Sequence, residues 1–238
     1  MGIINRGNEL LEPFYGCGVG ANFSSPLQFL ISWTNGESRR LTVLDLGCGE
    51  AKLLRLINRA NLNVDYWGVD IASSPEVDRR TLVNEQVLVF DGVKLPFDQN
   101  SFDVIICDQV LEHVKLPEPL LAEMLRCLKE GGALFGSVSY LEPYHSLSIY
   151  NFTPYGLALK LEGAGFRDIG LWPGPDVVHF IVRLLFRRVP FLRQVVFSPI
   201  AWAVKSCELL GLLNSRTSWL YRLYFSGHIR FLCGKSRQ

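Results

Sequence analysis

The segment from Asp45 to Gly49 could bind a ligand through its backbone. It has the sequence Asp-Leu-Gly-Cys-Gly, follows an apolar run over residues 41–46 and precedes a helical pattern. Glycines at the end of a strand let the backbone approach a ligand closely at the carboxyl edge of a parallel sheet. An isolated Gly-x-Gly turn is weak evidence, because an ordinary tight strand-to-helix turn has the same form.

Polar residues end three further apolar runs. Asp70 ends the second run about twenty residues past the glycines, where a carboxylate can accept both hydroxyls of a ribose. Asp91 ends the third run, at the height where an adenine ring would lie beside the sheet, and Asp108 and Gln109 end the fourth. Because four successive strands present such residues at one edge, we expect a nucleoside-binding site there.

Short apolar runs alternate with helical segments along most of the chain. The runs are continuously apolar, which is typical of parallel strands buried on both faces. Predicted strands are 41–46, 65–70, 87–91, 102–108, 132–140, 166–172 and 226–235, and predicted helices are 50–60, 109–129 and 154–163. This order predicts an α/β fold: a Rossmann-like, doubly wound, mostly parallel seven-stranded sheet with helices on both faces.

A chain of 238 residues can form one large domain with a modest appendage. We expect a lead-in over 1–40, a main domain over 41–172 and 226–235, and an α-helical insertion over 173–225 before the last strand. The glycine-rich stretch 13–26 is either a lid over the ligand or a plain surface lead-in.

Two residues after the glycine turn bear on the type of ligand. Ala51 stands where a third glycine is common, and Lys52 stands where the dinucleotide pattern Gly-x-Gly-x-x-Gly needs its last glycine. That glycine permits the tight approach of a pyrophosphate to the helix, so its absence disfavours NAD.

Several motifs in order resemble those of class I S-adenosylmethionine-dependent methyltransferases, in particular the small-molecule group. The motifs are VLDLGCG (43–49), WGVDIA (67–72), LVFDG (88–92), LPFDQNSFDVIICDQVLEHV (95–114) and LKEGGALFGSV (128–138). The resemblance implies S-adenosylmethionine as the cofactor and methyl transfer to a small molecule as the activity. It also implies that the first acid and glycines border the methionine moiety, the second acid binds the ribose and the third contacts the adenine. The residues expected to bind the cofactor are Asp45, Gly47, Gly49, Asp70, Ile71, Asp91, Gly92, Asp108 and Gln109.

Two histidines are candidate general bases for deprotonation of an acceptor. His113 follows the fourth strand, near the expected site, although a surface or packing role is an alternative. His145 lies in the segment 142–157, which loosely resembles a pattern of methyltransferases found with polysaccharide and lipid-linked glycan synthesis. Ser148 and Asn151 depart from that pattern, where Asp and Arg are expected.

The last 68 residues are basic, with ten Lys and Arg against two Asp and Glu, whereas the first 170 carry a net charge of −7. A helix over 177–189 would align His179, Arg183 and Arg187 in a cationic stripe, and its other faces would be apolar. Each arginine costs about 2.5–3.5 kcal/mol at a bilayer centre, so an interfacial helix fits better than a membrane span.

A second helix is expected from Ser198-Pro199, and Trp202, Trp219 and two tyrosines supply amphipathic rings. The insertion either contacts a membrane surface or packs against the active site or a second copy in a homodimer. The acceptor could then be a lipid-linked sugar or another amphiphile. Nucleic acid is not expected as a partner, because no recognition module accompanies the basic residues.

The six cysteines include no Cys-x-x-Cys pair, and no histidine lies at metal-ligand spacing, so no metal site is expected. With no signal peptide, these thiols suggest a cytoplasmic protein with peripheral membrane association as an option. Besides an active methyltransferase, a non-catalytic methyltransferase-like binding module and an NAD-dependent oxidoreductase are alternative functions.

Overall fold

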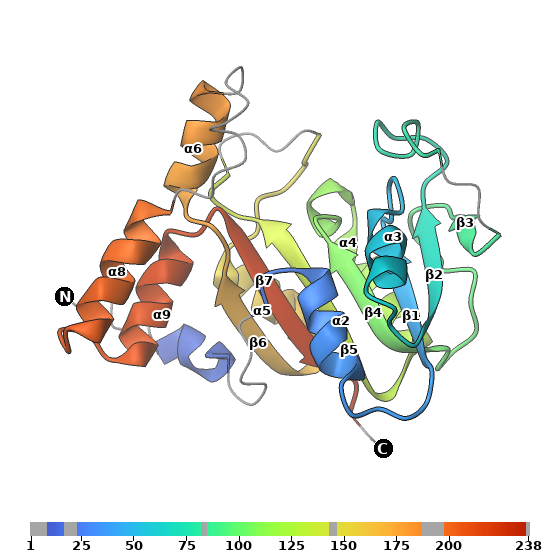
Figure 1. Cartoon of the computed structure of the whole chain (residues 1–238), viewed down its shortest axis with the longest axis horizontal. Coiled ribbons are helices and arrows are strands. Elements are labelled where there is room, and N and C mark those ends of the chain that lie inside the picture. The colour runs from blue at the N-terminus through green and yellow to red at the C-terminus, as the bar shows by residue number, and fades with distance from the viewer. Residues whose placement is uncertain (1–8, 17–22, 82–84, 143–146, 187–197, 237–238) are drawn as a thin grey trace.

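The computed structural model describes residues 9–16, 23–81, 85–142, 147–186 and 198–236. A central sheet crosses the molecule, with helices in front of it and behind it (Figure 1). Its seven strands have the order β3-β2-β1-β4-β5-β7-β6. Their bounds are β1 (Leu41–Leu46), β2 (Val64–Asp70), β3 (Val87–Val89), β4 (Phe102–Asp108), β5 (Leu128–Ser139), β6 (Arg167–Pro173) and β7 (His228–Gly234).

Strands β1 to β5 pair in parallel, and β7 pairs antiparallel with both β5 and β6. The strand order reverses at β1 and β4, whose carboxyl ends adjoin through the pair Leu46 and Cys107. A crevice at such a switch point is where open α/β sheets bind their ligands. The predicted fold class is confirmed, including the mostly parallel seven-stranded sheet.

Helices cover both faces of the sheet. On one face, α2 (Pro26–Thr34) and α3 (Lys52–Arg59) bury Phe29 and Ile57 in a cluster with Val43 and Phe135 of the strands. On the other, α4 (Pro117–Cys127) and α5 (Pro154–Gly163) contribute to a second cluster around β4, β5 and β7. The predicted start of α5 is confirmed, since the Thr153 hydroxyl accepts the Gly156 amide and Pro154 is the first helical residue.

The predicted helix over 109–129 is wrong at both ends. The chain after β4 first forms a short 3₁₀ helix, η2 (Leu111–His113), and α4 begins only at Pro117. Pro117 has no amide hydrogen and its ring disfavours helical backbone at Leu116, so the helix cannot extend further back. At the other end, Leu128 already belongs to β5, and Gly131, with φ of 71°, lies inside that strand.

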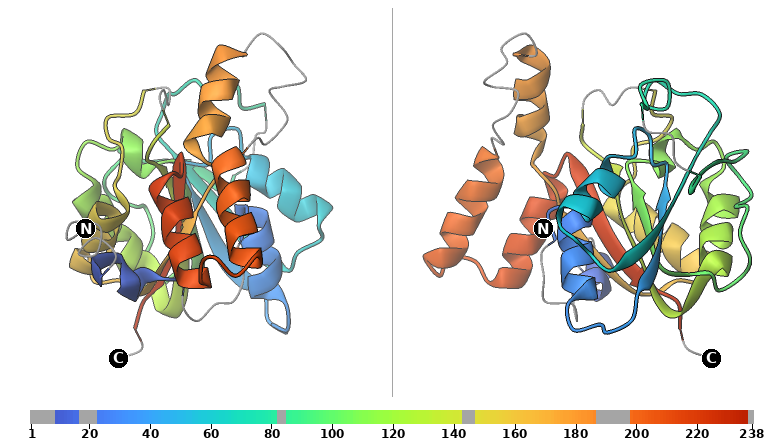
Figure 2. Two further views of the ribbon diagram at one scale, coloured as in Figure 1. Left: turned by 90° about the vertical axis from the view of Figure 1, so that its left-hand side faces the viewer. Right: turned by 45° about the vertical axis from the view of Figure 1, so that its right-hand side comes forward.

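The described parts of the chain between β6 and β7 are mostly helical, as predicted. They contain α6 (Val177–Leu185), α8 (Pro199–Leu209) and α9 (Ser215–Tyr224), which lie to one side of the sheet (Figure 2). Of the residues expected to form a cationic stripe on the first of these, His179 is buried and therefore not part of an exposed stripe, and Arg187 lies outside the described residues. In the part of the chain that the structure describes, no helix combines the length and apolar character needed to cross a membrane.

A buried carboxylate joins two helices of this insertion. Asp176 accepts the His179 amide through Oδ1, at the start of α6, and the amides of Ile200 and Ala201 through Oδ2, at the start of α8. Each helix start leaves backbone amides without intrahelical partners, so one carboxylate stabilises both. Asp176 is 1% exposed, which makes it a structural residue of the insertion.

Candidate active site

The turn after β1 adopts a backbone conformation that favours glycine. Gly47, Gly49 and Ala51 all have positive φ, at 70°, 49° and 55°. The Gly47 amide donates to the carbonyl of Val69 at 2.8 Å, which ties the turn to β2. Ala51 thus adopts the left-handed conformation that the missing glycine would adopt, at a cost of about 1–2 kcal/mol. The substitution preserves the path of the turn.

Asp70 links the end of β2 to this turn. Its Oδ2 accepts the Gly49 amide at 2.7 Å, and its Oδ1 accepts the Ile71 amide at 2.8 Å. These bonds fix the plane of the carboxylate at the carboxyl edge of the sheet, and each oxygen keeps a second lone pair for a ligand hydroxyl. The geometry brings three predicted residues, Gly49, Asp70 and Ile71, into one hydrogen-bonded unit.

A loop after β2 covers the same turn, and sequence reasoning missed its residues. The Arg80 Nε donates to the Gly49 carbonyl at 2.6 Å, and a Cβ added at Gly49 would lie 3.0 Å from the Cβ of Glu76. Arg80 therefore holds the turn from outside. An arginine in a loop is too common a feature for its position in the sequence to have revealed this contact.

Asp45 lies beneath the turn, on the side of the sheet that faces α2 and α3. The Tyr66 hydroxyl donates to its Oδ2 at 2.8 Å, and the side chain is almost fully buried. Burial raises the pKa of Asp45 to about 7, although the bond from Tyr66 opposes the shift. Asp45 therefore changes charge near neutral pH, and a cation bound above it would favour the charged form.

Asp91 and Gly92 lie just beyond β3, which ends at Val89 and not at Asp91 as predicted. Asp91 Oδ1 accepts the amides of Val93 and Lys94 at 2.8 and 2.7 Å, and these bonds lower its pKa. Gly92 has a φ of 84°. The side chain is exposed, so its ionised carboxylate can accept a hydrogen bond from a ligand amine.

Asp108 and Gln109 meet a serine that was not predicted. The Ser137 hydroxyl donates to Asp108 Oδ1 at 2.5 Å and accepts from Gln109 Nε2 at 2.6 Å. Burial raises the pKa of Asp108, while the bond from Ser137 lowers it. The Gln109 Oε1 is buried with no hydrogen-bond partner among the described residues. A buried acceptor without a partner costs free energy, so this oxygen is suited to a ligand donor.

Of the two candidate bases, His113 is among the described residues. His113 lies in η2 and is partly buried. Its neighbour Glu112 is completely buried and accepts the Ser139 amide, which attaches η2 to β5. His145 lies outside the described residues.

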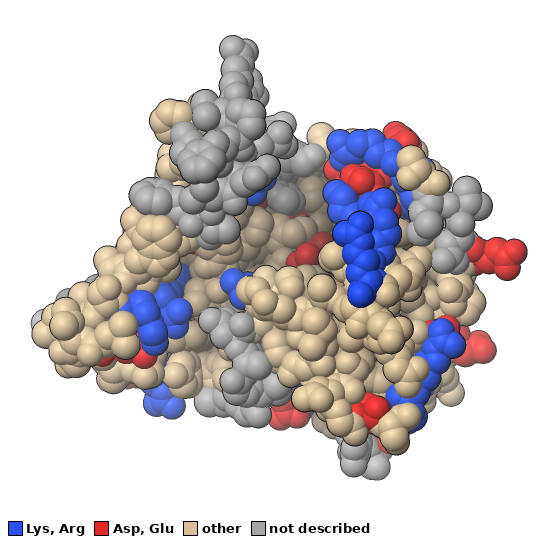
Figure 3. Space-filling view, in the orientation of Figure 1, with Lys and Arg blue, Asp and Glu red and all other residues tan. Residues whose placement is uncertain are grey.

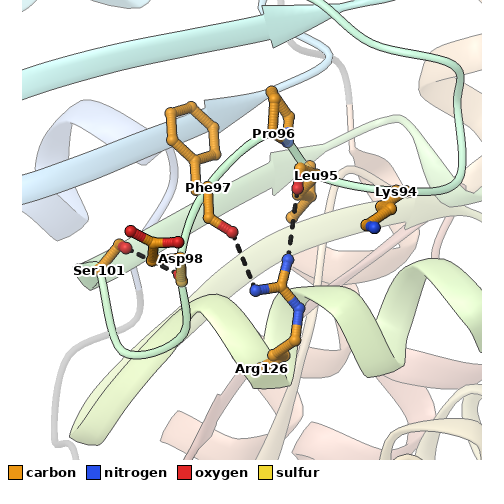
Figure 4. A pocket seen from close by; sticks show the side chains of 7 residues that line it. All are labelled: Lys94, Leu95, Pro96, Phe97, Asp98, Ser101 and Arg126. Atoms are coloured by element: carbon orange, nitrogen blue, oxygen red, sulfur yellow. Dashed lines mark hydrogen bonds between the residues drawn. The ribbon is translucent and has the colours of Figure 1, made fainter.

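A cavity elsewhere is distinct from this site. It lies beside the start of β4, where Arg126 donates to the carbonyls of Phe97 and Leu95 at 2.9 and 3.3 Å (Figure 4). The residues assembled above lie at the opposite ends of the strands. Within the described parts of the chain, no group of three or more His, Cys, Asp or Glu side chains could hold a metal ion.

Residues 44–136 match the family described as a methyltransferase domain. The chain therefore contains a methyltransferase domain over these residues. This domain includes the glycine turn, Asp70, Asp91, Asp108 and Gln109, and it ends within β5.

Curated relatives of the methyltransferase domain include the ubiquinone biosynthesis O-methyltransferase of Glaesserella parasuis serovar 5. It is 32% identical over 119 residues, which are 46% of this chain and 49% of that protein. The chain spans about half the length of most of the curated relatives it matches.

Solved structures resemble the chain over nearly its whole length. Phosphoethanolamine N-methyltransferase 2 of Haemonchus contortus, in complex with S-adenosyl-L-methionine, covers 98% of this chain and 57% of its own, with a TM-score of 0.56 and 19% identity. The [4+2]-cyclase SpnF covers 99% and 96%, with a TM-score of 0.57 and 17% identity. At such identities the likeness establishes the fold, and this fold serves proteins with different activities.

Proposed function

We propose that the chain transfers the methyl group of S-adenosylmethionine to a small-molecule acceptor. The observation that carries this proposal is the unit of Asp70, Gly49 and Ile71, because it holds a carboxylate at the carboxyl edge of the sheet, against the turn after β1, with both oxygens oriented by amides. A carboxylate at the end of the second strand is suited to the two hydroxyls of a ribose.

The other predicted residues fit the remaining parts of the cofactor. Asp91 and Gly92 would lie beside the adenine, and Asp45, Gly47 and Gly49 beside the methionine moiety. The buried Gln109 Oε1 supports this fit, because the ammonium group of the cofactor could supply the hydrogen-bond donor that the oxygen lacks. Asp45 and Asp108 would add negative charge near the cationic part of the ligand.

The bound cofactor would supply an activated methyl group on a positively charged sulfur. The protein then has to orient the acceptor, and good orientation of two reactants contributes up to roughly 7–11 kcal/mol. A base adds about 10²–10⁴-fold when the acceptor must lose a proton. On sequence grounds His113 and His145 are candidates for this role.

The insertion supports an amphiphilic acceptor at a membrane surface. None of the residues of α8 is buried, and Leu209, Leu210 and Leu212 at its end are 78%, 74% and 70% exposed. In the space-filling view of Figure 3, the tip of the insertion lies at the left and is largely uncharged. Lys205 pairs with Glu208, so apolar contact outweighs charge at this end.

An exposed apolar tip of this kind would bury itself in the headgroup region and hold the chain at the lipid surface. A second copy of the chain covering the same surface is the alternative outcome, and it would appear as a dimer in solution. Neither arrangement requires the chain to span the bilayer.

The function is tested by incubating the full chain with tritiated-methyl S-adenosylmethionine and two fractions of a cell extract, the lipid fraction and the water-soluble small molecules. We expect label to enter the lipid fraction, and to depend on Asp70. Label in the soluble fraction alone would reject the amphiphilic acceptor and keep methyl transfer. No transfer to either fraction, despite cofactor binding, would favour a binding module.

A further inference from the structure

Arg230 of β7 belongs to a row of polar side chains that crosses three strands. The row runs in register from Asp108, at the end of β4, through Ser137 of β5 to Arg230. Phe135 and Leu232, two residues away on β5 and β7, lie in the cluster that α2 and α3 cover. Because side chains two residues apart share a face of a strand, the row is on this face of the sheet, at its carboxyl edge.

The guanidinium of Arg230 is a partly buried cation without a carboxylate partner. Among the residues that the structure describes, it donates one hydrogen bond, to the Phe23 carbonyl at 2.5 Å, and forms no ion pair. Burial lowers its pKa, although the charge of Asp108 opposes that shift. A guanidinium has five N–H donors, and a buried charge without a partner costs free energy. Arg230 is therefore suited to an anionic ligand.

The end of β4, beside this row, is open to a ligand. Asp108 is exposed, although burial raises its pKa, and Gln109 and Arg230 are partly exposed. A side chain that solvent reaches and protein still surrounds lies on the floor of a hollow. The charge of Arg230 lowers the pKa of Asp108, so the guanidinium is close to the end of β4. A ligand held there can reach it over the edge of the sheet, without passing between strands.

The amino acid end of S-adenosylmethionine carries two opposite charges on one carbon, an ammonium group and a carboxylate. The ammonium has a candidate partner in the buried Gln109 Oε1. The carboxylate would meet Asp45, Asp70 and Asp108 at the same edge, and like charges disfavour its binding. A cation beside the ammonium partner would offset this repulsion.

Ser137 connects Gln109 to Arg230. Its hydroxyl accepts from Gln109 Nε2 at 2.6 Å, and it pairs in register with Arg230. Groups bonded to one carbon need neighbouring partners, and the two residues on either side of Ser137 are neighbours of this kind. Arg80 donates to the Gly49 carbonyl, but it belongs to the loop after β2, which β1 separates from β4 in the sheet.

We propose that Arg230 binds the carboxylate of the methionine moiety of the cofactor, beside the ammonium group at Gln109. The assignment rests on the proposed function. It adds a residue outside residues 44–136, the part of the chain that matches the methyltransferase family. A guanidinium and a carboxylate form charge-assisted hydrogen bonds, which are stronger than neutral ones. The last strand thereby takes part in cofactor binding, and its bond to Phe23 connects the lead-in to the same residue.

The test compares two ligands of the full chain. These are S-adenosylhomocysteine and its decarboxylated analogue, which has the same nucleoside and an ammonium group but lacks the carboxylate. Calorimetric titration at low ionic strength measures both dissociation constants. We expect the unmodified chain to bind S-adenosylhomocysteine at least about tenfold more tightly than the analogue, because a hydrogen bond between charged groups contributes at least that factor.

Replacing Arg230 by glutamine should remove this preference. The affinity of Arg230→Gln for S-adenosylhomocysteine should fall by at least about tenfold, whereas its affinity for the decarboxylated analogue should not fall. Arg167→Gln is the matched control and should keep the preference. Arg167 lies on the neighbouring strand β6 and likewise donates to a backbone carbonyl, that of Phe166 at 2.8 Å.

The outcomes distinguish a failure of this assignment from a failure of the proposed function. Binding of neither ligand to the unmodified chain would reject the proposed function. Equal binding of both ligands to the unmodified chain would overturn the assignment alone, whether or not Arg230→Gln folds. A preference that persists in Arg230→Gln would overturn it and favour an anionic acceptor as the partner of Arg230. An equal loss of affinity for both ligands in this variant would overturn it in favour of a structural role.

Discussion

The carboxylate of Asp70 accepts the backbone amide of Gly49 at 2.7 Å, across 21 residues of sequence. This bond connects the end of β2 to the turn after β1, the two elements that a nucleoside would contact first. Asp70 therefore has two roles that can be separated, since it stabilises the turn and presents oxygens to a ligand.

Replacing Asp70 by alanine should weaken binding of S-adenosylhomocysteine by at least about tenfold, because two hydrogen bonds to ribose hydroxyls are lost. Calorimetric titration measures the change. Asp65→Ala is the matched control, since Asp65 is on the same strand and contacts Trp67 and Gln86. Unchanged affinity in Asp70→Ala would reject the ribose assignment, even if the variant were less stable.

Replacing Asp45 by asparagine should stabilise the free protein at high pH. The pKa of Asp45 is about 7 in the folded chain and near 3.8 when unfolded. A raised pKa means that unfolding releases a proton between these values, so the free energy of unfolding falls as pH rises from about 4 to 7. An amide avoids this loss, and the gain at about pH 8 should reach up to about 4 kcal/mol.

Urea denaturation at several pH values measures this effect. The difference between Asp45→Asn and the unmodified chain should disappear towards pH 4, where the carboxyl is neutral in both states. Asp98→Asn, at an exposed carboxylate, should change stability by no more than about 0.5 kcal/mol. A stability difference for Asp45→Asn that is independent of pH would contradict a pKa of about 7 for Asp45 in the folded chain.

Replacing Asp176 by alanine should loosen α6 and α8 together, because one carboxylate caps both helices. Loss of a cap costs about 1 kcal/mol for a helix. Hydrogen exchange should become faster at the His179 and Ile200 amides. Asn214→Ala is the control, since Asn214 caps α9 alone through the Thr217 amide. Faster exchange confined to one helix in Asp176→Ala would contradict the shared cap.

Replacing Leu209 and Leu212 by serine should reduce flotation of the full chain with anionic phospholipid vesicles. Each leucine buried in the interface contributes about 1.5–3 kcal/mol, so the loss should exceed tenfold. Leu116→Ser with Leu159→Ser is the matched control, because both leucines are exposed outside the insertion. If the unmodified chain never floats, the tip does not bind lipid, and a dimer measured by ultracentrifugation would explain its apolar surface.

The sequence predicted most of the sheet because parallel strands buried on both faces are continuously apolar, as in residues 102–108. Helix starts marked by a proline at the first helical position, at Pro154 and Pro199, were also correct. The start of α4 was missed because the helical pattern after β4 outweighed the two prolines at 117 and 119.

The candidate site was only partly accessible from the sequence. Residues that follow a strand within one motif, such as Asp70 and Gln109, could be found from their spacing. Arg80, Ser137 and Arg230 could not, because the contacts join residues 28 to 207 positions apart. Their roles follow from strand order and register, which the sequence pattern does not specify.

The central claim is that the carboxyl edge of the sheet binds S-adenosylmethionine. Calorimetric titration of the full chain with S-adenosylhomocysteine and, separately, with NAD tests it most directly. We predict saturable binding of S-adenosylhomocysteine at one site per chain, weakened by at least about tenfold in Asp70→Ala, and no binding of NAD. Binding of NAD without binding of S-adenosylhomocysteine would contradict the claim.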